Sequence, residues 1–187
     1  MENIGRRAFV RRAAVGSIAL VSAPALVNAI AGTARADGGR GYYFQAVSKA
    51  PDVDSVQHRM IMGGCGSVSA DEVSGGGTFL HFNETTIDPR PVPRPILGTG
   101  TWRPRRLLDF EVIGTYGQLV AGIMEADIRL RPVAGGSIPA TLKVFCNIGP
   151  AGLQTGHEEG FTLDVGGLSF DHPLLGLTIF TSRPPFD

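Results

Sequence analysis

The sequence predicts an all-β protein, built as a single antiparallel β-sandwich or a small β-barrel domain. Apolar and polar residues alternate along several segments, as they do in strands with one buried face. Glycine and proline interrupt the chain about every 8 to 15 residues, and no window of about 11 residues keeps a helical apolar period. Seven or eight short strands in one domain are typical of sandwiches and small barrels.

The first 36 residues have the order of an export signal. A basic segment comes first, a weakly apolar run over residues 13–31 follows, and Ala34 and Ala36 form a small-x-small cleavage site. The run contains much alanine, glycine and serine, whereas a membrane-spanning helix needs about 20 strongly apolar residues. We therefore expect cleavage after Ala36 and no insertion in the membrane afterwards.

The basic segment carries a more specific pattern. Arg6 and Arg7 are followed at the second position by Phe9, which resembles the consensus of twin-arginine (Tat) signals. The resemblance implies that the Tat export machinery is a partner of the signal. It also implies a periplasmic or extracellular location in a bacterium.

The charge of the remaining chain excludes some partners. The full chain holds 17 basic and 17 acidic residues, and residues 1–36 contain five arginines and one glutamate. Removing them leaves 12 basic and 16 acidic residues, a net charge of about −4 over 151 residues. A mildly acidic chain lacks the basic footprint of a nucleic-acid-binding protein, and its length suits one domain.

The elements are expected in a simple order. Residues 37–57 are predicted to form an extended N-terminal arm, and residues 58–187 the sandwich or barrel domain. Residues 86–98 contain four prolines, so they are expected to be a connector or an edge segment. The expected strands cover residues 58–64, 77–83, 102–113, 118–132, 140–149, 160–167 and 176–182.

The clearest pair of strands is a hairpin of residues 102–113 and 118–132 around the turn signal Gly-Thr-Tyr-Gly. Strict alternation places Leu108, Phe110 and Val112 on one face of the first strand. In the second strand the residues expected on one face are Met124, Ala126, Ile128 and Leu130.

Folding this hairpin about Thr115 predicts its register. Arg105 then lies opposite Glu125, and Arg103 lies opposite Asp127. Opposite charges across a ladder are favourable by a few tenths of a kcal/mol, so this face is expected to be a solvated one with cross-strand ion pairs.

The chain has two cysteines, Cys65 and Cys146. In an oxidising compartment two cysteines first suggest a disulfide, which would close a loop of about 80 residues and stabilise by ~4 kcal/mol. Two separate buried thiols are the alternative. We expect the disulfide.

His58, Met60 and Met62 alternate, so in a strand they share one face. An imidazole and two soft thioethers could hold Cu(I). Because methionine is also a common gap filler in cores, ordinary packing is the simpler interpretation. His81 lies between Leu80 and Phe82 and is expected to be a core or rim histidine.

Searches for catalytic motifs give no candidate catalytic residue. The chain has no Gly-x-Ser-x-Gly elbow, no His-Glu-x-x-His motif and no dinucleotide-binding fingerprint. Cys146 is followed by His157 without a later methionine, so a blue-copper ligand set is not expected.

Two resemblances complete the prediction. The segments from Gly75 to Phe180, including "GTGTWRPRRLLDF", resemble secreted bacterial β-proteins of unassigned function, which implies the fold type and export. "GTGTW" followed by a long amphipathic hairpin also resembles the small barrels of dirigent proteins and allene oxide cyclases, which bind apolar ligands in their mouths. A pocket of this kind would be lined by Trp102, Phe110 and Tyr116.

The sequence thus favours an exported, non-enzymatic β-domain with a binding or cell-envelope role. One alternative is a barrel that binds an apolar small molecule or acts as a cyclase-like enzyme. The other is a periplasmic copper-binding protein that uses His58, Met60 and Met62.

Overall fold

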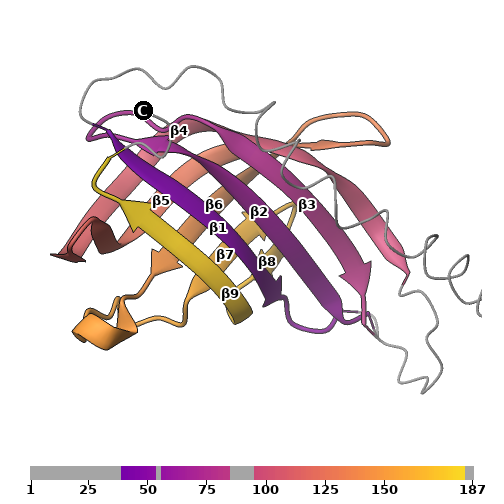
Figure 1. Ribbon diagram of the computed structural model, residues 1–187. Helices are drawn as coiled ribbons and strands as arrows, with labels where there is room; N and C mark the ends of the chain where they lie inside the picture. The colour runs from indigo at the N-terminus through magenta and orange to yellow at the C-terminus, as the bar shows by residue number, and fades with distance from the viewer. Residues whose placement is uncertain (1–38, 54–55, 85–94, 184–187) are drawn as a thin grey trace, which may run out of the picture.

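A computed structural model describes residues 39–53, 56–84 and 95–183, and this part of the chain is all-β, as predicted. Its nine strands form one antiparallel sheet, and a single short 3₁₀ helix, η1 (Gly149–Ala151), accompanies them (Figure 1). The strands are β1 (Arg40–Lys49), β2 (His58–Val68), β3 (Gly76–Asn83), β4 (Ile96–Tyr116), β5 (Leu119–Pro132), β6 (Ile138–Cys146), β7 (Gly160–Val165), β8 (Leu168–Phe170) and β9 (His172–Thr181).

The strand order closes the sheet on itself, as in a barrel. The order is β4-β3-β2-β1-β9-β5-β6-β7-β8, and β4 also pairs with β5 along most of its length. Strands β1, β2, β3, β4, β5 and β9 therefore form a closed ring of ladders. In Figure 1, β9, β1, β2 and β3 cross the front of the molecule, and the other strands lie behind them.

Strands β6, β7 and β8 continue the sheet from β5 and fold back against β1. The ring of Phe161 on β7 packs against that of Phe44 on β1, with centroids 6.1 Å apart. The Ser48 hydroxyl donates a hydrogen bond to the Phe161 carbonyl. These contacts join the two layers over an apolar interior.

The interior follows from strand alternation. In β5, Met124, Ala126, Ile128 and Leu130 are all buried, as predicted, while the residues between them are more exposed. In β1 the alternate residues Tyr42, Phe44, Ala46 and Ser48 are buried in the same way. Burying this apolar face is the main stabilising contribution to such a sheet.

The register of the β4–β5 hairpin differs from the predicted one. Arg103 lies opposite Arg129, Arg106 lies opposite Asp127, and the ion pair that forms joins Arg106 Nη2 to Asp127 Oδ2 at 2.8 Å. The reason is that the pairing shifts at three places along β4, and each β-bulge adds a residue that strict alternation does not count.

The same bulges change which side chains of β4 face inward. Leu107 lies opposite Ala126 and Phe110 opposite Met124, so these two pack against the core. Leu108 and Val112, which were predicted to share the face of Phe110, are exposed.

Residues 40–49, predicted as part of an extended arm, form β1, a strand with a partner on each edge. It pairs with β2 on one side and with β9 on the other. Alternation of Tyr42, Phe44 and Ala46 with more exposed residues is the local signal for this strand. The connector predicted over residues 86–98 falls partly on residues 85–94, which lie outside the described residues, and its end, from Ile96, belongs to β4.

The structure does not show the predicted disulfide, and Cys65 and Cys146 are both free, buried thiols. Cys146 shares the inward face of Leu142 and Val144, belongs to the core, and its Sγ lies 3.3 Å from the Thr178 carbonyl oxygen. Met62 and Gly64 occupy inward-facing positions of β2, and Cys65 is the residue after Gly64. Its side chain therefore points out from the opposite face of the strand. The two sulfurs therefore lie on opposite faces of the sheet.

We expect two protected thiols in the folded protein. Burial raises the pKa of Cys65, and it raises the pKa of Cys146 to about 11, so both remain protonated at pH 8. A thiol-reactive chromogenic disulfide should label the native protein slowly and should label two thiols per chain after unfolding without reductant. Unfolded, unreduced protein with no reactive thiol would contradict this arrangement.

Candidate ligand-binding site

An apolar cavity of about 610 Å³ opens at one end of the ring of strands. Its walls come from β2, β3 and β4, from the end of β5 with the residues after it, and from the β7–β8 hairpin. The large side chains that line it include Met60, Phe79, Leu130, Ile138, Leu168 and Phe170. This size and this lining are typical of sites for small organic molecules.

One glycine accounts for part of the hollow. Gly98 on β4 lies opposite His81 on β3 and lines the cavity. A Cβ atom placed on Gly98 would meet no other atom within 4 Å. The space therefore exists because no side chain fills it, and not because the backbone is pushed apart.

The rim of the cavity exposes apolar side chains to solvent. Ile96 and Leu97 at the start of β4 are 64% and 47% exposed, and Val133 after β5 is 80% exposed. Exposed apolar residues that gather around an opening often mark a surface that a ligand covers.

A pair of histidines lies at the cavity. His81, which lines it, faces His58 on β2, and His81 Nε2 lies 2.9 Å from His58 Nδ1. The edge of the His81 ring also packs on Phe170, with ring centroids 5.5 Å apart. Among the described residues, the second nitrogen of His81, Nδ1, has no hydrogen-bond partner.

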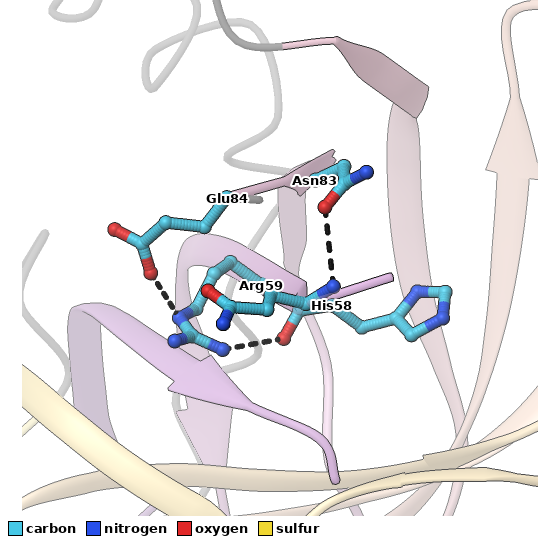
Figure 2. Close-up of polar contacts among 5 residues, drawn as sticks. His58, Arg59, Asn83 and Glu84 are labelled. Carbon is cyan, nitrogen blue, oxygen red and sulfur yellow. Dashed lines mark hydrogen bonds and ion pairs between the residues drawn. The ribbon is translucent and has the colours of Figure 1, made fainter. Parts of the chain in front are cut away.

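Polar contacts hold the chain next to His58. Figure 2 shows the His58 ring pointing away from the neighbouring Arg59, whose side chain turns to Glu84. Arg59 Nε lies 2.5 Å from Glu84 Oε2, and Arg59 Nη1 donates a hydrogen bond to the His58 carbonyl. Asn83 Oδ1 accepts a hydrogen bond from the Gln57 backbone at 3.1 Å. These contacts hold the ends of β2 and β3 together and leave His58 to face His81.

The electrostatics of the cavity are those of a neutral site. Burial, and then the nearby His58, lowers the pKa of His81 to about 4, so its imidazole carries no charge near neutral pH. The lining contains no charged side chain among the described residues. What the site offers is an apolar surface and one imidazole that can donate or accept a hydrogen bond.

The lowered pKa of His81 predicts acid sensitivity. The unfolded chain binds a proton at an ordinary pKa of 6.5 and the folded chain only near 4, so the free energy of unfolding should decrease as the pH falls through this window. The decrease should be smaller in His81→Phe, which keeps a ring beside Phe170. Urea unfolding with a metal chelator present, at several pH values between about 4 and 7.5, measures it. Equal slopes in wild type and His81→Phe would contradict the shift, and exposed His172→Phe is the control.

The structure separates the residues predicted for copper into two environments. Met60 lines the cavity directly opposite His81. Met62 lies opposite Phe79 and is fully buried in the core. Among the described residues no group of three or more His, Cys, Asp and Glu side chains is placed to hold a metal ion.

The predicted pocket of Trp102, Phe110 and Tyr116 is not where the cavity lies. Trp102 is buried in the core, Phe110 packs edge-on against Phe180 with centroids 5.6 Å apart, and Tyr116 is 61% exposed near the hairpin turn. All three come from β4, but none lines the cavity at the end of the ring.

Other predicted residues fall outside the structure. The Tat-type motif of Arg6, Arg7 and Phe9 and the cleavage site at Ala34 and Ala36 lie outside the described residues. In the part of the chain that is described, no helix has the length and hydropathy needed to cross a membrane.

A second, smaller hollow of about 330 Å³ lies on the outer face of β1 to β4. Gly63, Gly76 and Gly77 are among the residues that line it. We regard the cavity at the end of the ring as the candidate site, because it is larger and combines apolar walls with a side chain able to form a hydrogen bond.

Comparison of the chain with family models, with curated proteins and with solved structures gives no significant match. The function is therefore inferred from the geometry of the site.

Proposed function

We propose that this chain is an exported binding protein that holds an uncharged, largely apolar small molecule in the cavity at the end of the ring. The observation that carries the proposal is the cavity of about 610 Å³ whose apolar rim, including Ile96 and Val133, is exposed to solvent. Export is supported by the basic segment, the weak apolar run and the Ala34–Ala36 site of the N-terminal sequence. The role is binding, without turnover of the ligand.

The polar groups favour a particular class of ligand. His81 offers Nδ1, which suits a hydroxyl or a carbonyl group. A carboxylate would lose its hydration without meeting a cation, because the described lining is uncharged and His81 is neutral near pH 7. We therefore expect a long-chain or ring-bearing alcohol, ketone or similar molecule, and not a fatty acid anion.

Competition for a fluorescent probe tests the proposal. The neutral apolar dye N-phenyl-1-naphthylamine should bind with saturation at one site per chain and should brighten as it leaves water. A long-chain alcohol should displace it at a lower concentration than the carboxylate of equal chain length. Absence of saturable binding would refute the site, and a preference for the carboxylate would refute the proposed ligand class.

A further inference from the structure

Three side chains with metal-binding atoms share the inward face of β2 and β3 beside the cavity. His58 and Met60 are alternate residues of β2, so they share a face, and Met60 lies directly opposite His81 in the ladder with β3. His58 Nδ1 and His81 Nε2 already converge to 2.9 Å. Met60 is 2% exposed and lines the same cavity as His81.

The geometry points to a cuprous-ion site formed by His58 Nδ1, His81 Nε2 and the Met60 thioether. Thioether sulfur is a soft ligand that favours Cu(I), and imidazole suits copper equally well. Zn²⁺ prefers thiolate, imidazole and carboxylate ligands in a four-coordinate arrangement, which this cluster does not supply. The inference does not depend on the proposed apolar ligand, because that ligand would use the other nitrogen of His81.

Low polarity around the cluster favours the monovalent ion. Met60, Phe79 and Phe170 line the cavity together with His81, and His81 packs edge-on against the Phe170 ring. Burying one positive charge in such surroundings costs less free energy than burying two. The site should therefore hold Cu(I) in preference to Cu²⁺.

The hydrogen bond between the two histidines fits a preorganised metal site. One of the two facing nitrogens carries the bridging proton and the other accepts it, so the nitrogens converge before an ion arrives. When the ion binds, that proton moves to the outer nitrogen of its own ring, which leaves a lone pair on each facing nitrogen. Bonds from imidazole to first-row metals are roughly 2.0 Å long, so a shared trigonal ion would need the nitrogens about 3.5 Å apart. The two nitrogens, now 2.9 Å apart, must therefore separate by about 0.6 Å when the ion binds.

The structure also provides a matched control. Met62 is on the same strand and face as Met60, but it lies opposite Phe79 and has no exposed surface. Met62→Leu and Met60→Leu thus change the same chemical group at two buried positions of one strand. A role in packing predicts similar effects for both, whereas the copper site predicts an effect of Met60→Leu alone on copper binding.

Titration of the full chain with Cu(I) in the absence of oxygen, in competition with a chromophoric Cu(I) chelator, tests the inference. We expect one ion per chain in the wild type and a loss of affinity of more than about 100-fold in His81→Phe and His58→Phe, more than is usual for outer-shell partners of a ligand. Met60→Leu should weaken binding, and Met62→Leu should bind as the wild type does. Copper X-ray absorption should show two nitrogen ligands and one sulfur ligand.

Three results would overturn the site. The first is a wild type that does not compete with the chelator. The second is binding that survives His81→Phe, and the third is equal weakening by Met60→Leu and Met62→Leu. Tighter binding of Zn²⁺ than of Cu(I) would refute the choice of metal. Circular dichroism of each variant separates a lost site from a lost fold, and dye binding by the wild type, measured separately, tests the proposed apolar-ligand function.

Discussion

Replacing Trp102 by alanine is expected to lower the free energy of unfolding by about 3–5 kcal/mol, the usual cost of removing a buried tryptophan. Trp102 is 1% exposed, and its ring packs against Phe44 with centroids 5.8 Å apart. Its Nε1 donates a hydrogen bond to the Gly63 carbonyl at 3.2 Å. The variant would lose this burial and leave a cavity between β2 and β4.

The space that Trp102 fills is shaped by a glycine. A Cβ atom on Gly64 would lie 2.4 Å from Cζ2 of Trp102, so only glycine allows the indole to lie across β2 at this position. Denaturant unfolding should therefore show a lower midpoint for Trp102→Ala with little change in slope. Tyr116→Ala, on the same strand but exposed, should stay within about 0.5 kcal/mol of wild type. Equal effects of the two variants would contradict the position of Trp102 in the core.

Replacing Gly98 by leucine is expected to weaken binding of the apolar probe by more than about tenfold, or at least about 1.4 kcal/mol. The new side chain would enter the cavity, where a Cβ on Gly98 meets no atom within 4 Å. Gly98 is not one of the glycines with a positive φ angle, so a leucine at this position causes no backbone strain. Stability should remain the same or increase, because the added side chain is covered by apolar walls.

Gly149→Leu is the matched control for this variant. Gly149 begins η1, also has open space around its Cβ position, and is not left-handed. Probe titration and thermal unfolding of both variants give the comparison. Undiminished probe binding by Gly98→Leu would place the binding site elsewhere.

The alternation of the sequence was sufficient to predict most strands. β2, β3, β5 and β6 all overlap the segments where apolar residues alternate with polar ones. The register of β4 with β5 could not be predicted, because each bulge shifts the pairing of residues across the two strands by one. The pattern of apolar residues in the sequence does not show where such a bulge lies. Strict alternation therefore chose the wrong partners for Arg103 and Arg105.

The positions of the two cysteines along their strands already argued against the predicted Cys65–Cys146 disulfide. Cys146 has the parity of the inward residues Leu142 and Val144, whereas Cys65 has the opposite parity to Met60 and Met62. Cysteine count and an expected oxidising compartment suggested a bond, but strand parity already placed the two thiols on different faces.

Only part of the candidate site could be predicted from the sequence. His58 and Met60 were identified from their spacing, but the role of His81 depends on the register between β2 and β3, which brings His81 opposite Met60. The cavity arises from a missing side chain at Gly98, and a glycine in a strand does not by itself say whether the space beside it is empty or filled. The aromatic residues of β4 did not predict the pocket, because Trp102 is buried in the core and Tyr116 is exposed near the hairpin turn.

Native mass spectrometry of wild type and Gly98→Leu, purified without detergent and mixed with a long-chain alcohol, tests the central claim most directly. The cavity predicts a complex of one alcohol with one wild-type chain that is lost in Gly98→Leu, while both proteins keep the same folded charge distribution. A wild type that carries no alcohol, or equal complexes in both proteins, would contradict a ligand site at the end of the ring.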